Sequence, residues 1–465
     1  MASTDRRARP PNTDLARLIE ASGASHKSLA LRINQLAHTA GLGTSYSHTS
    51  IANWCRRGMT PKPPVPLLLA QAIGERLGRP VKLAEIGMGE AETPDANMGL
   101  DFPRDPTDAI RVATAFWSSV NRRDFLTGTG SSFAVSAFAA PVTRWLVTPA
   151  DETADHSGGR QVGCSDLDEL RDAAEHARRW DSKYGGGNWK ASSVTECLEH
   201  RAAPLLQGSF NDGIGRELFS VTAELSRLAG WTAFDVGQHQ AAQRHFIQAL
   251  RLARAGGDVQ LGCYVLTTMA MQSLMRGFAG EAIDMAQGAF ERAKQDAVPR
   301  VLAFTKLIEA RAHARAHDPR AASRALAASE DLLGRAAPDS GDEPGWIDFY
   351  HHARLAADAA EVFRDLKNPK AALAWNRQAA AMPPGVFTRS VGMRLAIVGT
   401  AHLQARDLDH GLELGHRSVD ILARVRSSRA LDYVREFNAA LAPWRREPAV
   451  REFQHRCRKE LDVAA

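Results

Sequence analysis

The sequence has few cysteines and no arrangement that would join them. Five are scattered over 465 residues, and none belongs to a Cys-x-x-Cys pair. Disulfide frameworks and structural zinc sites both need closely spaced cysteines, so neither organises this chain. The first fourteen residues, MASTDRRARPPNTD, also lack the apolar stretch of a secretory signal. We therefore expect a cytoplasmic protein.

Long hydrophobic runs are missing as well. An apolar, small-residue run reaches Val147 and opens with Asn-Arg-Arg-Asp-Phe-Leu at 121–126, a stretch similar to a twin-arginine export signal. The run is interrupted by glycines, by Pro141 and by Arg144, which makes it a poor membrane span. We expect it to pack on the repeat domain or its linker and not to bind a membrane. Membrane association or export through Arg122-Arg123 is the alternative.

Catalytic and metal-binding motifs are equally scarce. The glycines at 185–187 follow no buried strand and precede no Lys-Ser/Thr, which indicates a turn and not a phosphate-binding loop. His351 and His352 are adjacent, so on a helix they point about 100° apart and make a poor metal pair. We expect no enzyme activity, no cofactor and no metal.

Positive charge is concentrated at one end. Residues 1–90 carry 12 Lys and Arg against 6 Asp and Glu, whereas the rest of the chain is nearly neutral within a total of +5. A basic segment on a neutral body predicts that a polyanion binds at the N-terminal end.

The periodicity is helical nearly throughout, which predicts an all-α fold. Composition divides the chain into a helical unit at 1–88, a linker at 89–163 that includes the twin-arginine-like segment, and an Ala-rich helical region at 164–465. In the first unit, Asn12, Ser25 and Ser47 are N-cap residues of three helices, the second at His26–Asn34 and the third at 47–57. Apolar Ile51 and Trp54 share the inner face of the third helix.

These residues resemble the Cro-type (XRE) helix-turn-helix family. The match lies in Ser-His-Lys-Ser-Leu-Ala at 25–30 and in Ser-His-Thr-Ser-Ile-Ala-Asn-Trp at 47–54. The resemblance implies that the third helix enters the major groove of double-stranded DNA, with His48, Thr49 and Asn53 touching base edges. The implied DNA-binding set is His26, Lys27, His48, Thr49, Asn53, Arg56, Arg57 and Lys62. One departure is the link from Gln35 to Thr44, roughly eight residues longer than a typical turn. The alternative is a small helical bundle whose polar residues are only solvated.

The larger region resembles tetratricopeptide repeats. Gly230, Gly237, Ala242, Phe246 and Ala249 follow the repeat pattern, which recurs about 40 residues on and then more weakly again. Such helix pairs stack into an α-solenoid with a concave face lined by the first helix of each pair. We expect a groove for a peptide or small ligand, lined by Arg227, Trp231, Phe234, Tyr264, Met271 and Arg311. The alternative is that these side chains are core contacts between repeats.

The whole layout resembles a group of regulators found in streptomycetes and related actinobacteria, the NsdA-like proteins. This resemblance implies a transcriptional regulator in which the repeats bind a peptide, small ligand or protein partner and mediate homodimerisation. A second reading is a protein-binding adaptor of the tetratricopeptide type without DNA readout.

Overall fold

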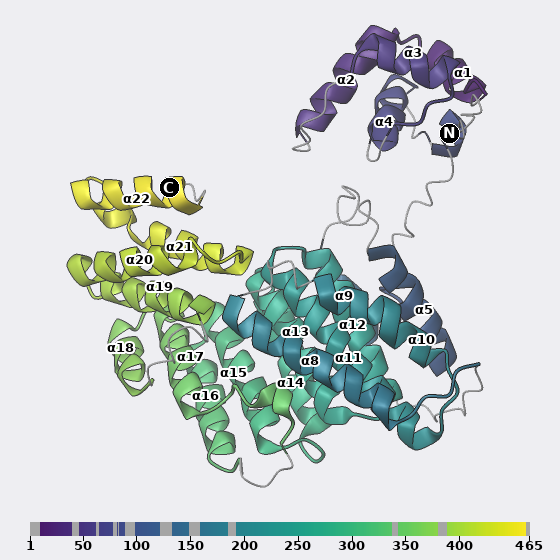
Figure 1. Cartoon of the computed structure of the whole chain (residues 1–465). Helices are drawn as coiled ribbons and strands as arrows, with labels where there is room; N and C mark the ends of the chain where they lie inside the picture. The colour runs from purple at the N-terminus through teal and green to yellow at the C-terminus, as the bar shows by residue number, and fades with distance from the viewer. Residues whose placement is uncertain are drawn as a thin grey trace, which may run out of the picture. The chain divides into compact units, whose positions relative to one another are not determined.

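The computed structural model describes residues 10–39, 46–61, 65–77, 81, 83–88, 98–120, 133–147, 159–184, 192–336, 343–379 and 388–461. The chain divides into two compact units, one built from the residues before 97 and the other from Asn97–Asn121 and Ser131–Ala465. Within the described residues both are helical, as predicted, and β-structure is limited to an isolated bridge between Gln161 and Ser209. Figure 1 shows the helices of both units.

The N-terminal unit packs its helices around one apolar core. Its elements are α1 (Thr13–Ala21), α2 (His26–Thr39), α3 (His48–Arg56), α4 (Val65–Leu77) and the short η1 (Leu83–Ile86). Asn12 caps α1 as predicted, because its side chain accepts a hydrogen bond from the Leu15 amide at 3.0 Å. The same side chain donates to the Ile86 carbonyl at 2.8 Å. One residue therefore joins the start of the unit to its end.

The predicted end of the second helix at Asn34 is wrong, because α2 continues to Thr39. Asn34 instead acts as a clamp: its Nδ2 donates to the Tyr46 carbonyl at 2.9 Å, and its Oδ1 accepts from the Tyr46 amide at 2.8 Å. Tyr46 then packs edge-on against Trp54, with 5.4 Å between ring centroids. This clamp fixes the start of α3 against α2, although the link between the helices is long.

The second unit is a stack of helix pairs (Figure 1). The pairs are α11 (Asp212–Asp235) with α12 (His239–Ala255), α13 (Val259–Met275) with α14 (Ala279–Ala293), α15 (Pro299–Arg315) with α16 (Pro319–Leu333), α17 (His352–Asp365) with α18 (Pro369–Gln378), α19 (Thr388–Gln404) with α20 (Leu408–Leu422), and α21 (Ser428–Ala440) with α22 (Pro448–Leu461). Each first helix packs against the first helix of the next pair. Short η6 (Gly345–Ile347) and η7 (Ala442–Trp444) lie between pairs.

The turns inside these pairs share one backbone conformation. A residue with positive φ ends the first helix of five pairs, and these residues are Gly237, Gly277, His317, Lys367 and Arg406. Their spacing of about 40 residues matches the period of the sequence pattern, with a longer step before Lys367. The repetition in the sequence therefore corresponds to repeated geometry.

The predicted linker at 89–163 is wrong for residues 98–120 and 133–147, which belong to the repeat unit. This segment holds α5 (Pro106–Val120), η2 (Val135–Phe138) and α7 (Ala139–Val147). Polar side chains of α12 donate to its backbone carbonyls: Arg244 to Met98 at 2.8 Å, and Gln248 to Gly99 at 2.8 Å. Because these donors find acceptors, the polar face of α12 is buried instead of solvated.

The apolar run therefore packs on the repeats, as expected, in the part that the structure describes. Trp145 of α7 lies so close to Gly262 of α13 that a Cβ there would be 2.6 Å from its ring nitrogen. Arg122 and Arg123 lie outside the described residues. No described helix combines the length and the apolar character needed to cross a membrane.

Ahead of the pairs in the chain lie α8 (Cys164–Tyr184), α9 (Ser192–Cys197), the π-helical η4 (Leu198–Ala202) and α10 (Ala203–Leu206).

A buried ionic cluster joins the first helix pair to the last two pairs. Asp235, at the end of α11, is fully buried and pairs with Arg389 of α19 at 2.7 Å and Arg429 of α21 at 3.2 Å. Arg389 also pairs with Asp181 of α8 at 3.0 Å.

Candidate nucleic-acid interface

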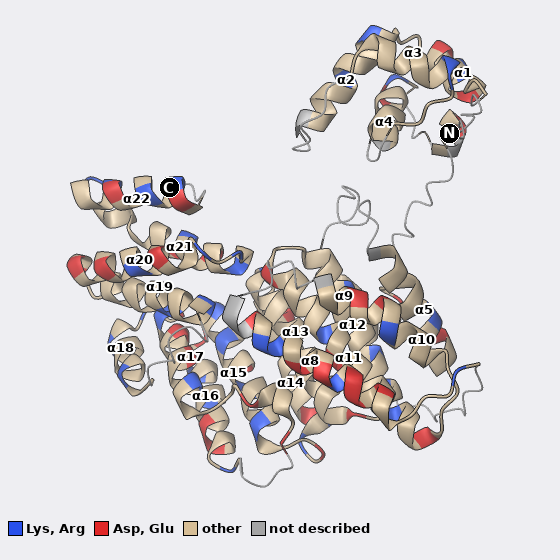
Figure 2. Ribbon diagram, in the orientation of Figure 1, with Lys and Arg blue, Asp and Glu red and all other residues tan. Residues whose placement is uncertain are grey.

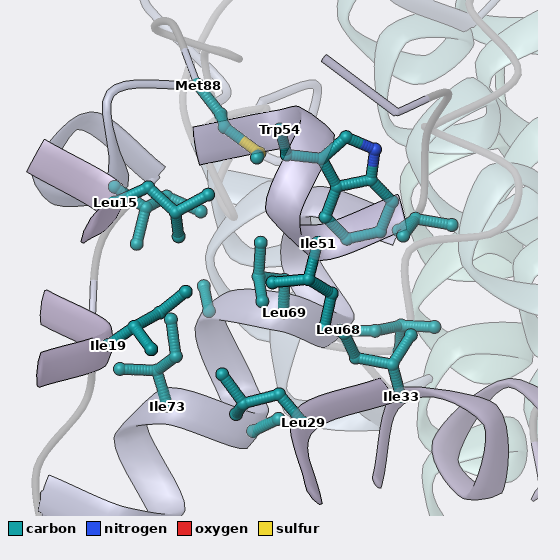
Figure 3. Close-up of a cluster of buried hydrophobic side chains, with 14 of the residues drawn as sticks. Leu15, Ile19, Leu29, Ile33, Ile51, Trp54, Leu68, Leu69, Ile73 and Met88 are labelled. Atoms are coloured by element: carbon teal, nitrogen blue, oxygen red, sulfur yellow. The ribbon is translucent and has the colours of Figure 1, made fainter. Parts of the chain in front are cut away.

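The third helix of the N-terminal unit is anchored from behind by apolar side chains. Ile51 and Trp54 point into the core and belong to the same buried cluster as Leu15, Ile33 and Leu69 (Figure 3). Ile51 is fully buried and Trp54 is 4% exposed. Cys55 completes the inner face, and burial raises the pKa of its thiol, so it remains a neutral packing group. The predicted anchoring of this helix by Ile51 and Trp54 is confirmed.

The opposite face of α3 carries polar side chains. Thr49, Asn53 and Arg56 are spaced at i, i+4 and i+7 and therefore lie along one side of the helix. Thr49 and Arg56 are exposed, and Asn53 is partly exposed. His48, also exposed, lies 3.5 Å from the Thr49 hydroxyl through its Nε2. Ser47 is the N-cap residue of the helix, and its amide donates to the Ser50 hydroxyl at 3.3 Å. The outer face of α3 thus presents several hydrogen-bonding groups together, while its inner face is packed in the core.

Charge on this surface has one sign. Neither α2 nor α3 contains an acidic residue (Figure 2). Lys27, Arg56 and Arg57 are exposed and form no ion pair with any described carboxylate. By contrast, Arg32 is held between α2 and α4 by both oxygens of Glu75, at 2.7 and 2.9 Å. Three cations at the start of α2 and the end of α3 are therefore available to a polyanion.

The structure brings most of the predicted DNA-binding residues to these two helices. His26 and Lys27 begin α2, behind Ser25, whose hydroxyl accepts from the Ser28 amide at 3.1 Å. Arg57 follows α3 directly. Lys62 lies outside the described residues. The clamp between Asn34 and Tyr46 was missed, although an Asn facing the long link was the available signal.

The predicted open groove in the repeat unit is wrong. Phe234, Tyr264 and Met271 are at most 6% exposed, Arg227 is 4% and Arg311 is 7% exposed, and only Trp231 is partly open. The chain itself covers this face. Trp231 donates from its Nε1 to Asp181 of α8 at 3.0 Å. The side chains are core contacts, which was the alternative reading.

Trp346 of η6 also covers this face of the repeats, and aromatic stacking holds it there. The Trp346 ring stacks on that of Tyr264 with centroids 4.8 Å apart and planes 10° from parallel. Burial raises the pKa of the Tyr264 hydroxyl, so this residue stays neutral. A peptide could reach the inner face only by displacing these contacts.

Two of the buried arginines differ in their partners. Arg311 donates to Glu361 at 2.8 Å and to the Tyr433 hydroxyl at 3.0 Å. The buried Arg227 Nε, however, has no hydrogen-bond acceptor among the described residues, and the guanidinium lies 4.7 Å above the Tyr264 ring. A buried cation without a carboxylate partner is unusual and costly.

Comparison with known proteins gives one result. A family model described as the SP15 N-terminal domain matches residues 15–89, which are nearly the whole helical part of the N-terminal unit. No curated protein and no solved structure matches the chain. The N-terminal unit is therefore similar to a recognised domain family.

Proposed function

We propose that the protein is a sequence-specific DNA-binding transcriptional regulator of the Cro-type helix-turn-helix class, acting in the cytoplasm without catalysis of its own. The observation that carries this proposal is the outer face of α3, which presents Thr49, Asn53 and Arg56 and no acidic group. A helix of this kind fits the major groove, where Asn can bind adenine through two hydrogen bonds and Thr can contact the thymine methyl group.

The cations at its edges support the same proposal. Lys27 at the start of α2 and Arg57 after α3 are both exposed. In the sequence, Lys27 precedes the polar residues of α3 and Arg57 follows them. Their role would be to bind phosphate and to set the position of α3 on the duplex, without reading sequence. Base-reading and phosphate-binding residues should then respond differently to substitution.

Fluorescence anisotropy with a DNA site selected from a random pool tests this difference. Asn53→Ala should weaken binding to the selected site by about 1–3 kcal/mol and leave binding to random DNA nearly unchanged. Arg57→Ala should weaken both and lower the salt dependence of binding by about one phosphate contact. Arg17→Ala is the matched control, because Arg17 is a surface residue of α1 already paired with Asp14 at 3.2 Å. Full affinity in both test variants would reject the assignment of α3.

We further propose that the repeat unit binds an anionic peptide, small ligand or protein partner and mediates homodimerisation. A carboxylate or phosphate would neutralise the buried charge of Arg227, and such a ligand reaches it only when the contacts of Trp231 and Trp346 open. Cro-type units read symmetric half-sites, which favours a dimer. Sedimentation with and without the DNA site measures the oligomeric state. If the repeats bind a protein partner and the protein shows no salt-dependent DNA binding, the result would instead support the protein-binding adaptor.

A further inference from the structure

Three side chains capable of binding a metal ion meet at the turn between α19 and α20. His402 lies in the last turn of α19, Asp407 is the N-cap residue of α20, and His410 lies in the first turn of that helix. The Asp407 carboxylate is 3.0 Å from the His402 Nδ1 and 2.9 Å from the His410 Nδ1. The positive φ of 66° at Arg406 reverses the chain just before Asp407, which brings the two histidines together.

The separations are close to those of a metal site. One ligand atom from each residue can be chosen so that all lie within 4.8 Å of one another. Zinc bonds to nitrogen and oxygen of about 2.0–2.2 Å imply ligand atoms roughly 3.4 Å apart in a tetrahedral site. Both imidazole–carboxylate distances are already shorter than this. The centroids of the two imidazole rings are 5.4 Å apart.

The surroundings of the three residues favour a cation. Asp409 and Glu413 lie on α20 within one turn of His410 and add negative charge to this end of the helix. The nearest cation in the chain, Arg406, directs its guanidinium over the Trp444 ring at 5.7 Å. His410 is well exposed, and His402 and Asp407 are partly exposed, so an ion can enter from solvent.

We propose that His402, Asp407 and His410 bind a divalent transition-metal ion, with Zn²⁺ preferred over Mg²⁺. Two imidazoles and one carboxylate are a common ligand set for zinc and leave one position for water, whereas Mg²⁺ prefers oxygen ligands alone. The ion replaces the protons that the two Nδ1 atoms otherwise donate to Asp407, so binding weakens as pH falls. Once bound, it joins the end of α19 to the start of α20.

A second turn of the same kind in this chain has counterparts of two of the three proposed ligands but lacks the third. Between α15 and α16, His313 and the N-cap residue Asp318 have the same spacing as His402 and Asp407, but Ala321 occupies the place of His410. The N-cap residue of α18 is Asn368, which accepts from the Ala371 amide at 3.2 Å. An asparagine can therefore cap a helix at this position of the repeat without a carboxylate.

Isothermal titration of the full-length protein with ZnCl₂ tests the proposal, with MgCl₂ as the comparison ion. We expect one Zn²⁺ per chain and no comparable heat with Mg²⁺. Asp407→Asn, which keeps the cap, and His410→Ala should each weaken the Zn²⁺ affinity at least tenfold. His200→Ala removes an exposed histidine elsewhere and should change nothing.

Circular dichroism shows whether each variant is folded, and Asp407→Asn remains informative if His410→Ala is not. Zn²⁺ affinity that is the same in Asp407→Asn as in the unchanged protein would overturn the proposal. Equal heats with Zn²⁺ and Mg²⁺ would also overturn it. In either case the cluster is only a hydrogen-bonded helix cap.

Discussion

Two buried arginines on neighbouring parts of the inner face should have opposite effects on stability when each is replaced by methionine. Arg389 is 5% exposed and lies between two carboxylates, with Asp235 at 2.7 Å and Asp181 at 3.0 Å. Arg227 is 4% exposed and has no carboxylate partner among the described residues. Methionine is close to arginine in length and apolar, so both substitutions remove the charge and keep most of the packing.

The magnitudes follow from what each substitution leaves behind. Arg389→Met leaves Asp235 facing Arg429 at 3.2 Å and Asp181 bonded to Trp231, so neither carboxylate is wholly alone. We expect a loss of about 3 kcal/mol, the lower end for breaking a buried ion pair. Arg227→Met leaves no buried group without its partner and loses only the contact with the Tyr264 ring, about 1 kcal/mol. Relief from burying a guanidinium whose Nε has no acceptor among the described residues exceeds that loss, so we expect a gain of about 1–2 kcal/mol.

Urea unfolding followed by circular dichroism at 222 nm measures both effects on the unliganded protein, because the repeat unit holds most of the helix. Equal losses of stability in the two variants would show that Arg227 has an acceptor as effective as those of Arg389, which contradicts the difference between them. A stabilised Arg227→Met protein that no longer binds an anionic ligand would connect the unpaired charge to the proposed ligand site.

Three further predictions concern packing and backbone. His317→Gly should raise the stability of the repeat unit by about 0.5–1 kcal/mol in urea unfolding, because φ of 60° disfavours a side chain; a loss would contradict this. Asn34→Ala should cost the N-terminal unit about 1–2 kcal/mol, seen as faster hydrogen exchange in α3, because both bonds to Tyr46 are lost. Gly230→Ala should lower the melting temperature, at a cost of about 1–3 kcal/mol, because its Cβ would lie 2.6 Å from the Phe246 ring; an unchanged melting temperature would show that the ring can move aside.

Local signals in the sequence predicted local structure well. The cap at Asn12 and the inner face of α3 follow from residue type and helical spacing, and both are present. The repeat alignment that starts at Gly230 also predicts buried positions, since Ala242, Phe246 and Ala249 are fully buried. These features depend on interactions within a helix or between adjacent helices, which the order of residues determines.

Long-range contacts were not predictable in the same way. The polar face of α12 suggests exposure, but Arg244 and Gln248 donate to carbonyls nearly 150 residues earlier in the chain. The inner face of α11 suggests a groove, but Asp181 of α8 and Trp346 cover it. A polar side chain looks the same in a sequence whether water or a distant carbonyl accepts its proton, so such docking segments are mistaken for linkers.

The most direct test of DNA recognition by α3 is sequencing of chromosomal DNA crosslinked to the protein in its own cells, with Asn53→Ala protein in parallel. Base reading by Asn53 predicts one recurring, symmetric sequence in the fragments recovered with the unchanged protein, and its disappearance with Asn53→Ala. Fragments without a shared sequence, or the same shared sequence recovered with both proteins, would contradict it.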